Sequence, residues 1–241
     1  MSVDAVPQSR SGLLLVWDTL SAPKGAFEAL RERPRWLWAF VLTAAVGMVG
    51  SFLVVPAGEH IATATIAHQA ATDPNMAGMS PAKIRQITDL SVTVQRVVWV
   101  FYPLIVLIAI ALAALVLLVG NAISRGSANF ARLFSLAANV AIINFGVGYL
   151  IVGILVALRG PEDFTSQSDV LRVVPSLAWL APGAAPKLLV FLGTFNPFQI
   201  WSFALLALGL RTIAGLRAVP SYVIAAIVTF GGVLFAVPFA R

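Results

Sequence analysis

Long stretches of this chain contain almost no side chain that water would solvate. Residues 104–119 contain none at all, and four more apolar segments of comparable length occur elsewhere in the chain. About 20 apolar residues form a helix long enough to cross the hydrocarbon core of a bilayer. Only 11% of the 241 residues are charged and the mean hydropathy is +0.92, whereas soluble domains are about 25% charged. The sequence therefore predicts a protein whose solvent is lipid.

The apolar segments predict an all-α polytopic membrane protein, a bundle of about five transmembrane helices with short amphipathic interfacial helices. The expected spans are residues 36–55, 97–119, 134–158, 193–213 and 222–239. We expect residues 1–11 to form a disordered tail, residues 12–35 a cytoplasmic interfacial segment, and residues 36–241 the membrane domain. Pro56 is expected to close the first span, because proline breaks the interior of a helix.

Two segments outside the spans have amphipathic patterns. Around Phe27 and Leu30 the pattern fits a helix in the membrane interface, and equally a helix packed on the protein's own cytoplasmic face. Ser80-Pro81 is typical of a helix start. The helix that follows repeats apolar residues every three or four positions, and we expect it to lie on the membrane before the second span.

Basic residues decide the expected orientation. Five of them precede the first span, at Arg10, Lys24, Arg31, Arg33 and Arg35. Cytoplasmic segments of membrane proteins carry the excess of Lys and Arg. We therefore expect a cytoplasmic N-terminus, a C-terminus on the opposite side and, if the protein is bacterial, location in the cell inner membrane.

Catalytic chemistry has no support in the sequence. No Asp, Glu, Lys, Arg or His lies in the middle of an expected span, which argues against a proton relay or a charged substrate path. There is no cysteine, and His60 and His68 match no zinc spacing, so we interpret them as solvated loop histidines. The net charge of +6 comes from residues at the ends of apolar segments and does not indicate nucleic-acid binding. We expect no enzyme activity, cofactor or metal.

A few polar and small residues within the spans are the candidates for function. Asn139 and Asn144 are five residues apart, so on a straight helix they point about 140° away from each other and form no common site. We expect each to make an interhelical hydrogen bond. The candidate helix-contact or groove-lining residues are Asn139, Asn144, Gly146, Gly148, Asn196, Pro197, Gln199 and Trp201.

The dipeptide Asn196-Pro197 has two interpretations. It can start the fourth span, with Asn196 as the capping residue and Pro197 in the first turn. Alternatively, residues 187–210 form one apolar stretch that is kinked or broken at this point. Broken helices often build binding sites in transporters, although no matching break is evident in another span.

Three segments resemble the Yip family (Ypt-interacting proteins), in particular its bacterial branch. Pro23, Phe27, Leu30 and Pro34 precede the first span, and GSANFARLF, residues 126–134, leads into the third. FNPFQIWSFALLALGLRTIAGL, residues 195–216, resembles that family's fourth span. The resemblance covers roughly residues 15–236. It implies a five-span bundle with a cytoplasmic N-terminus and, for the eukaryotic members, roles in vesicle traffic and membrane shaping.

The chain also departs from that family. Asn196 stands where members often have an acidic residue, and the Asp-Leu-Tyr-Gly-Pro motif of eukaryotic members is absent. GTPase binding is therefore not carried over.

We expect a non-enzymatic scaffold or adaptor for membrane proteins, or for membrane organisation and trafficking. Its expected partners are membrane lipids and other membrane proteins or a second copy of itself. The alternative is a small transporter or channel subunit for a neutral or lipidic substrate, with a groove lined by Asn139 or Asn144 and by Asn196 or Gln199.

Overall fold

The computed structural model describes residues 11–76, 78–181 and 183–233. Within them the chain is helical, without a β-strand. The long elements are α3 (Leu37–Thr72), α4 (Pro81–Val98), α5 (Tyr102–Ile123), α6 (Phe130–Ala141), α7 (Tyr149–Arg159), α10 (Pro197–Ala214) and α11 (Ala218–Phe230). The short helices are α1 (Gly12–Ser21), α2 (Pro23–Glu32), α8 (Gln167–Leu171) and α9 (Pro186–Gly193). The 3-10 turns are η1 (Trp99–Phe101), η3 (Pro161–Asp163) and η4 (Leu177–Leu180), and η2 (Ile142–Gly148) is a π-helical segment.

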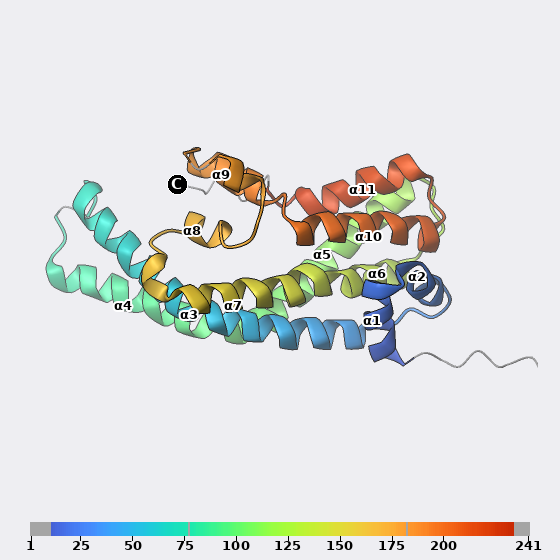
Figure 1. Cartoon of the computed structure of the whole chain (residues 1–241), viewed down its shortest axis with the longest axis horizontal. Helices are drawn as coiled ribbons and strands as arrows, with labels where there is room; N and C mark the ends of the chain where they lie inside the picture. Colours follow the sequence, from blue (N-terminus) through green and yellow to red (C-terminus); the bar gives the residue numbers. More distant parts are fainter. Residues whose placement is uncertain (1–10, 77, 182, 234–241) are drawn as a thin grey trace, which may run out of the picture.

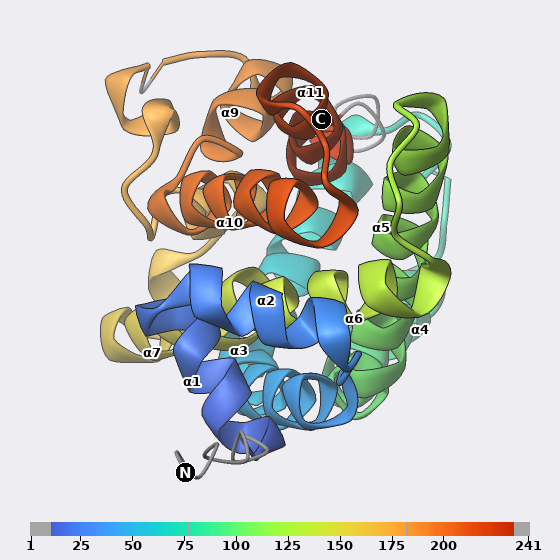
Figure 2. The same cartoon turned by 90° about the vertical axis from the view of Figure 1, so that its right-hand side faces the viewer.

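The long helices run roughly along one axis and form a bundle (Figures 1 and 2). Four uninterrupted helical segments are long and apolar enough to cross a bilayer: Leu37–Thr72, Pro81–Ile123, Phe130–Arg159 and Pro197–Ala214. This confirms the all-α polytopic membrane fold. The fifth expected span begins in α11, which has 13 residues, and its last residues, 234–239, lie outside the described part of the chain.

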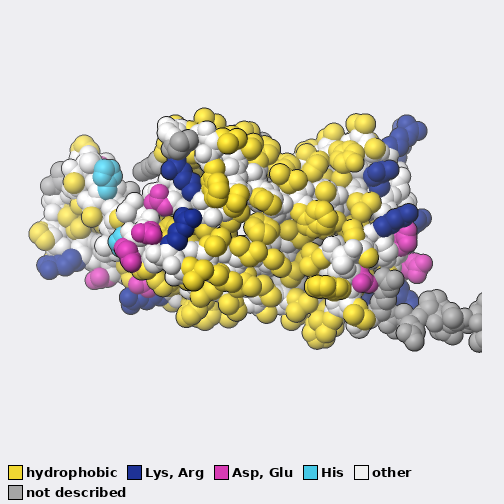
Figure 3. Space-filling view, in the orientation of Figure 1, with side chains coloured by type: hydrophobic (Ala, Val, Ile, Leu, Met, Phe, Trp, Pro, Cys, Tyr) yellow, Lys and Arg dark blue, Asp and Glu magenta, His cyan; other side chains and the backbone are white. Residues whose placement is uncertain are grey.

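The surface shows which direction crosses the membrane. Apolar side chains cover a broad band around the middle of the bundle (Figure 3). Lys and Arg gather at the end where α2 lies, which we call the basic end. Charged side chains of both signs gather on the other side of the band, and beyond them the tips of α3 and α4 project. The bundle axis is therefore the expected membrane normal.

Of the two alternatives expected for the helix around Phe27 and Leu30, the structure shows the packed one. Phe27 and Leu30 of α2 are fully buried, and α2 packs on α6 and α10 of the bundle itself. Leu14 and Trp17 of α1 are instead 56% and 67% exposed. The segment is thus docked through α2, while α1 leaves apolar side chains exposed and lies next to Trp38 at Gly12.

Helix α3 does not end at Pro56, so that expectation was wrong. Proline in a helix interior costs about 3 kcal/mol, but tertiary packing offsets the cost here. Ala57 and Ile61, in the next turns, are buried against Val156 and Phe164. With 36 residues, α3 is about 54 Å long at 1.5 Å per residue. It is therefore longer than the roughly 30 Å of a hydrocarbon core.

The third span contains a feature that the sequence did not indicate. Between α6 and α7, residues Ile142–Gly148 form a π-helical segment. Its wider turn bonds the Tyr149 amide to the Asn144 carbonyl and leaves the Phe145 carbonyl to accept a hydrogen bond from the Tyr102 hydroxyl of α5. Such segments are rare and occur frequently at functional sites.

The break at Asn196-Pro197 satisfies both interpretations of that dipeptide. α10 begins at Pro197, with the Asn196 side chain accepting hydrogen bonds from the amides of Phe198 and Gln199 at 3.0 and 3.1 Å. A separate apolar helix, α9, ends just before it at Gly193. The expected start near Gly193 is therefore too early by four residues. α10 begins part-way along the bundle (Figure 1), within the length over which the apolar band extends (Figure 3).

Candidate functional site

Two features of the bundle lack an obvious structural role. The first is the projecting hairpin, which we define as residues 57–72 of α3 together with α4. These two helices pack side by side and extend beyond the apolar band (Figures 1 and 3). The second is a cleft inside the band, between α5 and the pair α10–α11.

Helix α4 does not lie across the bundle axis as a surface helix would. It packs along α3 and passes through one 3-10 turn, η1, directly into α5. The Ser80 hydroxyl accepts a hydrogen bond from the amide of Lys83, which confirms the helix start predicted at Ser80-Pro81. The membrane-surface position expected for this helix is therefore wrong, because its packing partner is the extension of α3.

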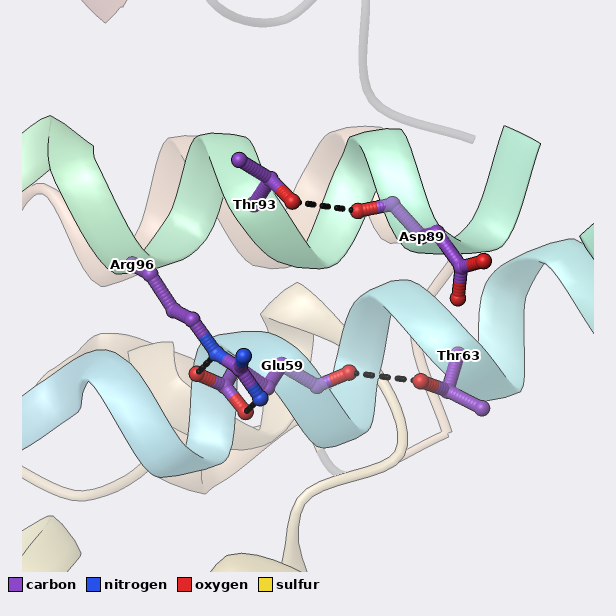
Figure 4. Close-up of polar contacts among 5 residues, drawn as sticks. All are labelled: Glu59, Thr63, Asp89, Thr93 and Arg96. Atoms are coloured by element: carbon purple, nitrogen blue, oxygen red, sulfur yellow. Dashed lines mark hydrogen bonds and ion pairs between the residues drawn. The ribbon is translucent and has the colours of Figure 1, made fainter. Parts of the chain in front are cut away.

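A two-point ion pair joins the helices of the projecting hairpin (Figure 4). Arg96 donates from Nε to Glu59 Oε1 at 2.7 Å and from Nη2 to Glu59 Oε2 at 3.2 Å. Thr63 and Thr93 donate their hydroxyls to carbonyls one turn earlier in their own helices. Of the contacts drawn, only the Glu59–Arg96 pair therefore joins α3 to α4.

We expect Arg96→Gln to loosen the projecting hairpin without unfolding the bundle. An exposed ion pair contributes little to stability, because water and salt screen it. Amide hydrogen exchange in residues 57–72 and 81–96 should become faster, while exchange in α5 and α7 stays unchanged. Added salt should reproduce part of this effect in the wild type, because salt screens exposed charges. Unchanged exchange in the hairpin would show that apolar contacts alone hold it.

The outward face of α4 carries an apolar stripe, which we define as Leu90, Val94 and Val97. These side chains are 65%, 49% and 45% exposed. Their spacing of four and three residues places them in one row along the helix. Phe101, four residues further on in η1 and also exposed, extends the row to the turn that leads into α5. We call this exposed row, from Leu90 to Phe101, the apolar strip; it leads along α4 toward α5.

The cleft has a volume of about 1,030 Å³, at the upper end of small-molecule sites in proteins. α5 and α11 meet at Gly120 and Ile224, and the cleft opens beyond this contact. Its rim residues Ile105, Leu112 and Ile227 are about half exposed, so it opens sideways, toward lipid. Among the described residues that line it there is no Asp, Glu, Lys, Arg or His.

One side of the cleft is polar, and we call Asn144, Gln199 and Ser202 the polar wall. Asn144 donates from Nδ2 to Gln199 Oε1 at 3.0 Å and to Ser202 Oγ at 2.8 Å. The π-helical segment positions Asn144, and the first turns of α10 position the other two residues. Asn196, which caps that helix, lines the cleft as well. These contacts tie α10 to the third span through polar groups inside the apolar band.

The short helix α8 closes the end of the cleft farther from the basic end, through Val170 and Leu171. Asp169 fixes this turn by accepting hydrogen bonds from the amides of Ser166 and Thr165 at 2.8 and 2.9 Å. Burial raises the pKa of the Asp169 carboxyl, but the hydrogen bonds from Ser166 and Thr165 outweigh it and leave the pKa below its ordinary value. The carboxylate therefore stays ionised, and α8 stays anchored, throughout the neutral range.

The candidate residues named from the sequence divide into two groups. Asn144, Gly148, Asn196 and Gln199 line the cleft; Asn139, Gly146, Pro197 and Trp201 do not. Asn139 is fully buried and donates to the carbonyls of Arg35 and Ser135 at 2.9 and 2.8 Å. Asn139 and Asn144 thus form separate sites, as expected, although Asn139 reaches the connection before α3 rather than another helix.

The other three are placed by their surroundings. Gly146 faces α3, Pro197 occupies the first turn of α10, and Trp201 is 46% exposed on the outer side of that helix. Ser202 is a polar residue of the expected fourth span but is not among the candidates, although its position three residues after Gln199 on a helix was a usable signal. Val170 and Leu171 are not among the candidates either, because nothing distinguishes them within a polar loop.

The histidines are on a helix, not in a loop as expected. Both lie on α3, and His60 Nδ1 is 3.0 Å from the Phe164 carbonyl oxygen. Among the described residues, no group of three or more His, Cys, Asp or Glu side chains is arranged to hold a metal ion.

The long apolar helices, the lipid-exposed band and the buried polar contacts within it define a multi-pass α-helical membrane protein. The family model of the Yip1 domain matches residues 17–239. The chain therefore belongs to the Yip1 domain family, which confirms the resemblance noted from its sequence. It is also similar to membrane protein YknW of Bacillus subtilis (strain 168), at 26% identity over 226 residues that cover 90% of this chain and 85% of that protein. No solved structure matches the chain.

Proposed function

We propose that this protein is a non-enzymatic scaffold or adaptor that holds another membrane protein, and that the projecting hairpin is its docking element. The observation that carries the proposal is the apolar stripe of Leu90, Val94 and Val97. It is exposed on a helix that leaves the membrane and bears no described contact on that face. Clustered apolar side chains on a water-exposed surface mark interaction sites.

The shape of the strip indicates the kind of partner. It runs from Leu90 on α4 to Phe101, the last residue of η1, which leads directly into α5. A partner helix that crosses the membrane beside α5 and continues past the bilayer would cover the whole strip. We therefore propose an integral membrane partner rather than a soluble one. The basic end supports a cytoplasmic N-terminus and location in a bacterial inner membrane, with the projecting hairpin on the opposite side.

A site-specific photo-crosslinker tests this proposal in native membranes. Placed at Leu90, it should give one discrete adduct with a second protein. The control position is Asp89, which is also exposed but lies about 100° around the helix; it should give little adduct. We expect Val94→Asp to reduce the Leu90 adduct roughly tenfold, as loss of a central apolar contact does, with no change in melting temperature.

The other outcomes decide against parts of the proposal. Adducts with lipid alone at Leu90 would rule out a protein partner for the stripe. An adduct of exactly twice the chain's mass would identify a second copy of this protein as the partner. Equal adducts at Leu90 and Asp89 would show that the contact does not depend on the stripe.

A further inference from the structure

The polar wall of the cleft has hydrogen-bonding groups left over. Asn144 uses both Nδ2 hydrogens on Gln199 and Ser202. Within the described residues its Oδ1 accepts no hydrogen bond, and Gln199 Nε2 donates none. Both side chains are only half-buried and line the cleft. One free acceptor and one free amide donor therefore face the same apolar cavity.

Hydrogen-bonding groups without a partner, such as Asn144 Oδ1 and Gln199 Nε2, cost free energy inside the apolar band. The apolar band offers little water, and an unsatisfied polar group in that environment costs free energy. The cleft also exposes the break before α10, through Gly193 and Asn196. Non-helical backbone at membrane depth is tolerated where it is buried in protein or lines a cavity. The π-helical segment, the helix break and the free amide groups all converge on one side of the cleft.

The remaining walls restrict the chemistry of a ligand. None of the described residues that line the cleft is charged, so none of them would neutralise a phosphate, carboxylate or ammonium group. Its other walls are mostly apolar, and the hydroxyl-bearing residues among them are Ser51, Tyr102, Tyr149 and Thr229. The opening between the exposed Ile105 and Ile227 would admit molecules from the lipid phase. A matching ligand carries an uncharged hydrogen-bonding group attached to hydrocarbon.

We propose that the cleft binds one neutral glycerolipid of the diacylglycerol class. Its free hydroxyl donates to Asn144 Oδ1, an ester carbonyl accepts from Gln199 Nε2, and its acyl chains lie along α5 and α11. This site is separate from the stripe on the projecting hairpin and does not depend on the proposed docking function.

A photoactivatable diacylglycerol in reconstituted vesicles of phosphatidylcholine tests the site. In the wild type, labelling should saturate, should be displaced by unlabelled diacylglycerol, and should map to peptides of α5, α10 and α11. Gln199→Leu removes the free donor, so labelling should require a three- to tenfold higher probe concentration, as expected for loss of one hydrogen bond. A probe of the same acyl composition with a phosphate headgroup should label the cleft at least tenfold less.

A second variant separates binding from folding. Ala109→Phe fills the cleft from α5 without touching the polar wall, and it should abolish saturable labelling while the melting temperature is retained. The matched control is Ala45→Phe on α3, at an exposed position away from the cleft; it should label like the wild type.

Several results would overturn the proposal. These are labelling that does not saturate, equal labelling of the Ala109→Phe variant, and equal labelling by the phosphate-bearing probe. Absence of label in the cleft peptides of the wild type would mean that another occupant, such as a partner helix or the chain's own C-terminal residues, excludes the lipid.

Discussion

Replacing Gly153 with alanine is expected to destabilise the bundle by about 3 kcal/mol. An added Cβ at Gly153 would lie 2.5 Å from the carbonyl oxygen of Gly50 and 2.9 Å from its Cα. These obstructing atoms belong to the backbone of α3, so no side chain can rotate away and the two helices must separate. Close approach of small residues is what holds membrane helices together, because lipid supplies no hydrophobic drive between them. The loss should appear in the thermal unfolding of the purified protein in detergent.

The control for this experiment is Gly193→Ala. There an added Cβ finds only ordinary contacts with Leu171 at 3.8 Å, and alanine favours a helix over glycine by up to about 1 kcal/mol. We expect Gly193→Ala to leave the melting temperature unchanged or slightly higher. If Gly153→Ala were equally harmless, α3 and α7 would have to be able to shift apart without loss, and the close crossing would not be a stability determinant.

The contact between Gly50 and Gly153 could be predicted from the sequence only in part. The glycines of the third span, and the small residues Gly47 and Ser51 of the first span, indicate that both spans make close helix contacts. The actual match of Gly50 with Gly153 depends on the rotation and depth of two helices, which no local pattern encodes. Likewise, Pro56 carries a strong local signal for a helix end, and packing more than 90 residues away along the chain overrides it, at Val156 and Phe164.

The residues of the cleft were also predictable only in part. Asn144, Asn196 and Gln199 were identifiable because polar side chains in apolar segments are costly and therefore informative. Their convergence was not, since it depends on the π-helical segment that sets the direction of Asn144 and on where α10 begins. Residues that close the cleft from α8 have no unusual property of their own and acquire their role only through the fold.

Asn196→Ala is the variant expected to have the next largest effect, a loss of about 2 kcal/mol. Its side-chain oxygen accepts from two amides at the start of α10, and helix caps of this kind contribute up to about 2 kcal/mol. We expect the upper end of that range, because the start of α10 lies within the apolar band, where water cannot replace the lost acceptor. The measurement is thermal unfolding in lipid nanodiscs, combined with amide exchange of Phe198 and Gln199.

Asn196→Ser separates the cap from the other contacts of this residue. Serine keeps an acceptor that can cap the helix but loses the hydrogen bond from Asn196 Nδ2 to the Gly193 carbonyl, at 3.2 Å. If capping dominates, Asn196→Ser should recover most of the stability that Asn196→Ala loses and should restore slow exchange at Phe198. If serine is as damaging as alanine, the bond to Gly193 holds α9 and α10 together across the break, and the two helices behave as one interrupted span. Full stability of both variants would mean that water in the cleft accepts the hydrogen bonds from the amides of Phe198 and Gln199.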